Sequence, residues 1–177
     1  MCGFGSKDRR TVSPTPILKL AIFDINGEKV DTNEFNDVEF IVSASLWSPD
    51  MSVPLDLASP NRSLDYDEIS WLKSMVKNIS GTNISNGVAL EDTDGELFIF
   101  FIFNDLSVKK PGDYRLRFSL SKIPESDYYS NFEELDHIFS DVFTVFSAKN
   151  FPGVLPSSSL SKFFSQKSAN KTFKGLK

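Results

Sequence analysis

Three cationic side chains, Lys7, Arg9 and Arg10, lie close together near the start of the sequence. Lysine and arginine neutralise phosphates, and the counterions released on binding give affinity for a nucleic acid whatever its base sequence. Two glycines precede this cluster, but the spacing G-x-x-x-x-G-K-[ST] of a nucleotide phosphate loop is absent. The cluster therefore points to contact with the backbone of a nucleic acid rather than with a bound nucleotide.

The charge of the chain is unevenly distributed. The net charge is −5, yet residues 1–19 balance to +3 and residues 142–177 carry six lysines and no acid. Residues 20–141 hold 9 basic and 23 acidic residues. Basic terminal segments on either side of an acidic central region favour binding to a polyanion. Lysines at chain ends can also serve only to keep a protein in solution. Charge alone leaves both interpretations open.

The sequence offers little for catalysis. His137 is the only histidine and Cys2 the only cysteine, so neither a disulfide framework nor a cysteine-based metal site can form within one chain. A lone histidine without a serine nucleophile motif is more often structural than catalytic. An enzyme, a cofactor and a small-molecule substrate are therefore not expected. One cluster of carboxylates could suggest acid–base chemistry, but it lies in a polar stretch that is typical of a solvated loop. Its members are Asp65, Asp67 and Glu68.

The acidic run at 91–96 superficially resembles a calcium-binding loop. If Gly95 takes loop position six, the first ligand position falls on Leu90 and the closing acidic position on Phe101. Two oxygen ligands are then missing. The run predicts a tight acidic turn, not a metal site.

Length and composition predict one folded, β-rich domain. The chain has 177 residues, of which 40% are hydrophobic and 13% aromatic, with seventeen phenylalanines. No apolar run approaches the roughly 20 residues of a membrane span, and no signal peptide pattern is present, so a soluble intracellular protein without membrane contact is expected. Matches to the N-glycosylation pattern are then interpreted as chance; they start at Asn61, Asn78, Asn83 and Asn170.

The elements that must position the cations centre on residues 97–120. Residues 97–103 form an unbroken apolar run, which predicts a strand buried on both faces. In the next strand Tyr114, Leu116, Phe118 and Leu120 alternate with polar residues, and residues 110–113, Lys-Pro-Gly-Asp, predict the turn between the two.

The order Gly-x-Tyr-x-Leu at 112–116 is similar to the tyrosine corner of immunoglobulin-like sandwiches, in which the hydroxyl ties down the preceding corner. Leu116 would stand where those domains carry a cysteine, which indicates a sandwich without the disulfide. Any antiparallel pair with a tyrosine near its start would fit equally well, so both interpretations remain.

Weaker patterns complete the chain. Periodicity predicts strands over 17–23, 38–46, 88–90 and 142–146, turns over 24–28 and 81–86, and a long loop over 49–68. Residues 121–137 are polar and acidic, and residues 69–79 fit a short helix or a strand. A serine cap before Leu160, Phe163 and Phe164 predicts a short terminal helix, followed by lysines.

Four blocks, taken together, resemble the fungal velvet domain: CGFGSKDRR with the prolines that follow, LFIFFIFNDLSVKKPGDYRLRFSL, FTVFSAKNFPG and the final SLSKFF helix. Their order along the chain makes the resemblance specific. Two departures stand out, because family members usually have a further strand before the glycines and an unbroken proline tract where this chain reads Ser-Pro-Thr-Pro.

The resemblance implies an all-β fold with minor α, an immunoglobulin-like β-sandwich similar to Rel-type DNA-binding domains. A single velvet domain would span 1–177, with a basic lead-in at 1–16, the sandwich at 17–150 and a helix with a basic tail at 151–177. The resemblance favours a strand over 71–79. It also assigns DNA contact to Lys7, Arg9 and Arg10, and more weakly to Lys149 in the F-S-A-K block.

The function implied is that of a nuclear, non-enzymatic transcriptional regulator that shuttles with the cytoplasm. Its partners would be double-stranded DNA and another velvet-domain protein, in a homo- or heterodimer, and it would control sporulation, fungal development and secondary metabolism. The alternative is an interaction scaffold that reaches DNA only through a partner.

Overall fold

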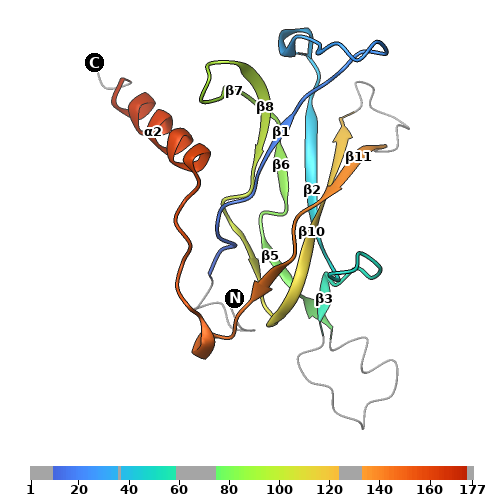
Figure 1. Ribbon diagram of the computed structural model, residues 1–177, viewed down its shortest axis with the longest axis vertical. Coiled ribbons are helices and arrows are strands. Elements are labelled where there is room, and N and C mark those ends of the chain that lie inside the picture. The colour runs from blue at the N-terminus through green and yellow to red at the C-terminus, as the bar shows by residue number, and fades with distance from the viewer. Residues whose placement is uncertain (1–9, 36, 59–74, 124–132, 175–177) are drawn as a thin grey trace.

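The computed structural model describes residues 10–35, 37–58, 75–123 and 133–174, with backbone alone for 167–174. Strands make up most of the described chain, and they stand in two layers with a helix to one side (Figure 1). The predicted all-β class with a minor helical part is confirmed. The helical segments described are η1 (Thr32–Phe35), η2 (Ala148–Asn150) and α2 (Ser159–Lys174).

The first layer is built on the phenylalanine-rich strand, which pairs with an antiparallel strand on each side. The chain then turns and continues into a short strand with its own antiparallel partner. In spatial order the first group is β1 (Ile17–Leu20), β8 (Leu97–Ile102) and β7 (Val88–Glu91), and the second pair is β5 (Ile79–Gly81) and β9 (Leu106–Val108).

The second layer is centred on the longest strand, which pairs with one neighbour along most of its length. A further strand pairs with its first residues, and a two-stranded ribbon lies beside the layer. The order is β11 (Glu134–Phe139), β10 (Gly112–Lys122), β2 (Phe40–Trp47) and β6 (Ile84–Asn86); β12 (Phe143–Val145) pairs with β10, and β3 (Leu57–Ala58) with β4 (Val76–Lys77).

The core lies between the layers and follows from the alternation of the strands. Along β2 every second residue from Phe40 to Leu46 is buried, and the residues between them are only partly covered. Phe103, just after β8, meets Phe118 of β10 with ring centroids 5.3 Å apart. Aromatic pairs at this separation gain about 0.5–1.5 kcal/mol beyond the area they bury.

Strand β8 is buried on both faces, as its unbroken apolar sequence predicts. Its inward residues join the core between the layers, while Phe98 and Phe100 face outward beneath α2. Phe164 of the helix packs on Phe100 with ring centroids 4.9 Å apart, and Ser158 caps the helix by accepting the N–H of Ser161 at 3.1 Å. The helix predicted here is confirmed and is longer than expected.

A tyrosine corner is present at the start of β10. The Tyr114 hydroxyl donates to the carbonyl oxygen of Lys110 at 3.1 Å, and the ring is buried. Gly112 has φ +153°, and a Cβ there would lie 3.1 Å from the Tyr114 hydroxyl, so the close approach requires glycine. Leu116 is buried at the position considered for a cysteine. The finer immunoglobulin-like topology stays a prediction.

Some predicted boundaries are wrong. Residues 84–86, predicted as part of a turn, form β6 and pair with β2, and the polar stretch before 137 contains most of β11. Both strands lie at an edge and expose their side chains, so hydrophobic alternation does not reveal them. The strand predicted over 71–79 is confirmed only from 76 onward, as β4 and β5 with a break at Asn78, and residues 71–74 lie outside the described chain.

Candidate nucleic-acid interface

Two of the four predicted DNA-contacting residues are brought together from opposite ends of the chain. Arg10 places its guanidinium carbon 4.5 Å from the ring centroid of Phe151, and Lys149 lies in η2, two residues before that ring. Both cationic side chains are exposed. A guanidinium stacked on an aromatic ring keeps its N–H donors available in the plane of the group. Lys7 and Arg9 lie outside the described residues.

Hydrogen bonds hold the segment after Arg10 against the body of the protein. The backbone N–H of Val12 donates to the carbonyl of Leu106 at 2.7 Å. The segment after Arg10 therefore lies alongside strand β9. The Ser13 hydroxyl donates to the carbonyl of Leu155 at 3.3 Å, in the exposed segment that leads from η2 to α2. Arg10 and Lys149 therefore share one end of the molecule as a consequence of the fold.

Two acidic segments of the described chain gather at one end of its long axis (Figure 1). The end that carries the 23–39 segment and the β7–β8 turn, here called the acidic end, has six acidic residues against one lysine in 23–39 and four acidic residues in 91–96. The opposite end carries Arg10 and η2. The distance of these acidic segments from Arg10 reduces their repulsion of a polyanion that binds there.

Hydrogen bonds also fix the acidic end. Asp92 accepts the N–H groups of Asp94 and Glu96 at 2.9 and 3.1 Å and forms a 2.8 Å ion pair with Lys19. The hydrogen bond from Lys19, followed by those from the turn, lowers the pKa of Asp92. The predicted tight turn is thus confirmed. No group of three or more metal-ligating side chains occurs in the part of the chain that the structure describes.

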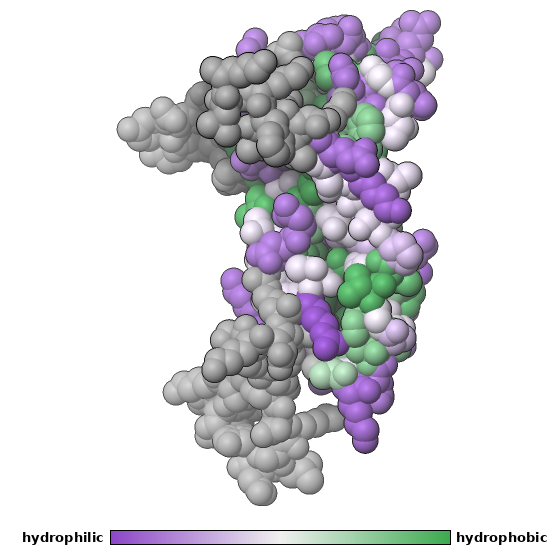
Figure 2. Space-filling view, turned by 90° about the vertical axis from the view of Figure 1, so that its left-hand side faces the viewer, coloured by the Kyte–Doolittle hydropathy of each residue, from purple (hydrophilic) through white to green (hydrophobic). Residues whose placement is uncertain are grey.

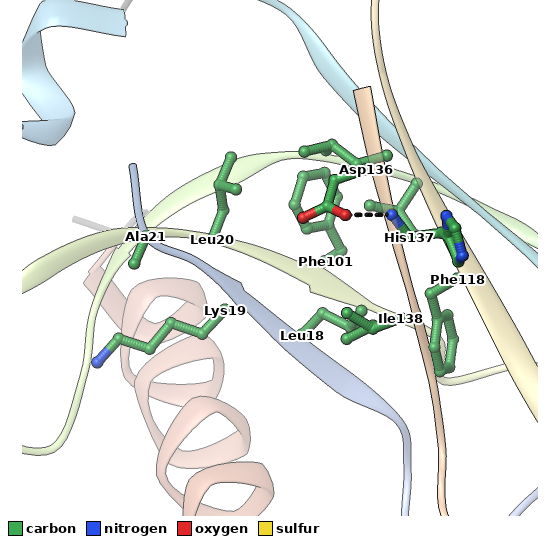
Figure 3. Close-up of a pocket in the computed structure, with 11 residues that line it drawn as sticks. Leu18, Lys19, Leu20, Ala21, Phe101, Phe118, Asp136, His137 and Ile138 are labelled. Atoms are coloured by element: carbon green, nitrogen blue, oxygen red, sulfur yellow. Dashed lines mark hydrogen bonds between the residues drawn. The ribbon is translucent and has the colours of Figure 1, made fainter. Parts of the chain in front are cut away.

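A cleft of about 260 Å³ opens between β1 and β11 (Figure 3). Leu18, Leu20 and Phe101 line it from one layer and Phe118 and Ile138 from the other. The layers are joined at the opposite edge, where the hydroxyl of a β6 serine accepts the backbone N–H of Ile102 at 3.0 Å. The cleft is therefore the side on which the apolar core comes nearest to solvent.

The polar groups at the rim of this cleft bind to their own neighbours. The Asp136 carboxylate accepts the backbone N–H of His137 at 2.7 Å (Figure 3). Nδ1 of His137 lies 3.1 Å from Oε1 of Glu134. Lys19 points away from the cleft, toward Asp92. The residues that line the cleft include no serine, threonine or cysteine, so the rim offers no paired nucleophile and base.

Seen from the side of α2, the surface mixes hydrophilic and hydrophobic residues (Figure 2). A small hydrophobic patch lies in the lower half of this face. In the segment between η2 and α2, Val154 and Leu155 have 74% and 60% of their surface exposed. Among the described residues, no helix has the length and apolar character that crossing a membrane requires.

Sequence reasoning treated Lys110 only as part of a turn. The structure puts Lys110, its neighbour Lys109 and Lys77 of β4 at the end of the molecule that also carries Arg10 and Lys149. We call these five residues the basic end. The signal in the sequence is a pair of lysines at the start of a predicted turn, because a turn between two layers lies at an end of the fold.

Comparison with known proteins identifies the family. The chain matches the velvet factor family model over residues 1–69 and 65–175. It is 32% identical over 169 residues to a spore development regulator vosA of Beauveria bassiana and 32% identical over 163 residues to a sexual development regulator velC of Gibberella moniliformis. It is 25% identical over 249 residues to a velvet complex subunit 2 of Gibberella moniliformis.

These alignments cover 91%, 91% and 93% of this chain but only 56%, 33% and 56% of the relatives, so the chain spans about half of their length or less. The family model nevertheless covers nearly the whole sequence. The chain therefore belongs to the fungal velvet family.

Proposed function

We propose that this chain is a non-enzymatic regulator of fungal development that binds duplex DNA through its basic end. The observation that carries the proposal is the meeting of Arg10 and Lys149 beside Phe151, at the end of the molecule opposite the acidic turns. Phosphate neutralisation by such cations supplies affinity, and arginine can in addition read guanine by paired hydrogen bonds. Lys7 and Arg9 add to the same positive segment of the sequence.

The developmental role is proposed from the relatives. Two of them are named for spore and sexual development, and the third is named as a subunit of a velvet complex. We extend this to the present chain as a regulator that acts in the nucleus as a homo- or heterodimer with another velvet-domain protein. Control of secondary metabolism belongs to the same proposal.

The test is the affinity of the purified chain for a short DNA duplex, measured by fluorescence anisotropy over a range of salt concentrations. Arg10→Ala/Lys149→Ala should weaken binding and make its salt dependence shallower by about 0.9 per lost phosphate contact. A matched control is Lys29→Ala/Lys162→Ala, which changes the net charge equally but lies away from the basic end. Equal effects of the two double variants would refute the assignment of Arg10 and Lys149.

The second candidate is an interaction scaffold that reaches DNA only through a partner. The strongly acidic end favours it, because a large negative surface repels DNA but suits a basic protein surface. A gel shift with the chain alone, and with the chain plus a second velvet protein, separates the two functions. A shift that requires the second protein supports the scaffold and counts against direct binding.

A further inference from the structure

The β9–β10 corner and strand β4 form one hydrogen-bonded unit that carries three lysines. The backbone N–H of Lys109 donates to the carbonyl of Asn78 at 2.8 Å, and the N–H of Lys110 donates to the Asn78 side-chain oxygen at 3.0 Å. Lys77 immediately precedes Asn78 in the chain. These contacts bring Lys77 beside the two corner lysines, although 32 positions separate it from Lys109 in the sequence.

The backbone of this unit is held rigidly. Asn78 has only 2% of its surface exposed; its side-chain amide donates to the carbonyl of Leu55 at 3.1 Å and its backbone N–H to that of Asp56 at 2.6 Å. On the other side of the corner, the Tyr114 hydroxyl donates to the Lys110 carbonyl. A corner fixed at both sides presents its side chains with little loss of backbone entropy on binding.

The lysines of this unit are available for a ligand. Lys77 and Lys110 are exposed and Lys109 is half-buried, and none of the three forms an ion pair with a residue that the structure describes. Three other cations of the described chain are engaged: Lys19, Lys29 and Arg117 form ion pairs with Asp92, Glu96 and Glu134, respectively.

Acidic side chains near the corner are already hydrogen-bonded within the fold. Asp56 accepts the backbone N–H of Leu46 at 2.7 Å, and Asp113 accepts the hydroxyl of Thr144 at 2.7 Å. Both carboxylates keep their negative charge and offset part of the positive potential of the lysines, although neither forms an ion pair with them among the described residues. A polyanion would bring the closely placed negative charges that these lysines lack.

The corner is coupled to the segment that carries Lys149. Gly112 pairs with Val145 in the β10–β12 ladder. Lys110 precedes Gly112 by two residues, and Lys149 follows Val145 by four residues. Strand pairing therefore holds the corner and η2 at the same end of the molecule, where their cations can contact successive phosphates of one ligand (Figure 1). A ligand with regularly repeated negative charges, and not a single phosphate, matches such a surface.

We infer that Lys77, Lys109 and Lys110 contact the phosphate backbone of the same duplex as Arg10 and Lys149, which makes the β9–β10 corner the second half of the interface. This inference rests on the proposed DNA-binding function. Contacts from these five described residues contribute about −4.5 to the slope of log affinity against log salt, of which Arg10 and Lys149 contribute about −1.8. Contacts of this kind add affinity equally on all base sequences.

The test compares Lys109→Ala/Lys110→Ala with the full chain on two duplexes of unrelated sequence. The slope should become shallower by about 1.8 on both duplexes. When the salt concentration rises from about 50 to 200 mM, the variant should therefore lose about 12-fold less affinity than the native chain does. Lys109→Arg/Lys110→Arg should keep the slope, and Lys29→Ala/Lys162→Ala serves as the charge-matched control. Urea unfolding midpoints of all variants verify that they fold.

The outcomes separate this inference from the proposed function. If Arg10→Ala/Lys149→Ala reduces the slope and Lys109→Ala/Lys110→Ala leaves it unchanged, the inference is overturned and DNA binding stands. A reduction no larger than that of the charge-matched control also overturns it. If the full chain does not bind either duplex, the proposed function and the inference fall together.

Discussion

Asn78 is the residue on which the placement of the corner lysines most depends. Replacing it by alanine removes two side-chain hydrogen bonds, one to the Leu55 carbonyl at 3.1 Å and one from the Lys110 N–H at 3.0 Å. Because Asn78 is almost completely buried, the Leu55 carbonyl loses a partner where water has little access. The backbone N–H of Lys110 lies on an exposed residue, so water can replace the lost bond there.

The size of the effect follows from these two groups. A lost hydrogen bond costs about 1 kcal/mol net, and a buried polar group left without a partner costs about 1–3 kcal/mol. We therefore expect Asn78→Ala to lower the free energy of unfolding by about 2–4 kcal/mol. With a urea m-value of about 2 kcal/mol/M, the unfolding midpoint should fall by about 1–2 M.

Equilibrium urea unfolding, followed by circular dichroism, measures this change directly. Asn83→Ala is the matched control, since Asn83 is exposed and its amide lies 3.4 Å from the Ala44 carbonyl; it should alter stability by less than about 0.5 kcal/mol. If Asn78→Ala were as mild as Asn83→Ala, with an unchanged m-value, the corner would not be held by Asn78 and the argument for a rigid lysine surface would fail.

Three further predictions concern the corner, the helix and the acidic turn. Tyr114→Phe removes the hydroxyl bond to Lys110 but keeps the buried ring, and should lower the free energy of unfolding by about 1 kcal/mol in the same urea assay; no loss would contradict the corner bond. Phe164→Ala should detach α2 from Phe100, seen as faster hydrogen exchange in the helix with little change in the strands, at a cost of about 2–3 kcal/mol if helix docking is part of global unfolding. Asp92 has a lowered pKa in the fold, so its ionised form stabilises the protein above the unfolded pKa of about 4, and this stability is lost as pH falls through the lower folded pKa. The stability difference between the native chain and Asp92→Asn should therefore be largest near neutral pH and shrink below about pH 4; a difference that persists in acid would contradict the role of the Lys19 contact.

The central strands could be predicted from the sequence because the spacing of their apolar residues shows which faces are buried. The apolar run at 97–103 has no alternation, and the structure shows why: one face lies in the core and the other beneath α2. Tyr114 was found through its spacing from Gly112, since a corner of this kind depends on local geometry. Strand β11 was missed because every residue from Glu134 to Ile138 is exposed, so no face carries a burial signal.

The interface was harder to predict than the strands. Arg10 belongs to a cationic cluster that the sequence itself shows, and Lys149 follows from the resemblance. Their meeting at Phe151 joins residues about 140 positions apart through a contact that has no periodicity. Asn78 was interpreted as a chance glycosylation match, and its role became visible only from its burial and hydrogen bonds. The distance between the acidic segments and Arg10 likewise depends on the order in which the strands run.

The most direct measurement of the central claim is backbone amide NMR of the chain during titration with a short DNA duplex. Binding through the basic end should change the chemical shifts of residues 10–13, 77–80, 107–113 and 147–151, and of none in the acidic end at 23–35 and 91–96. Changes confined to the acidic end or to the β1–β11 cleft, or spectra that do not change on adding DNA, would contradict it.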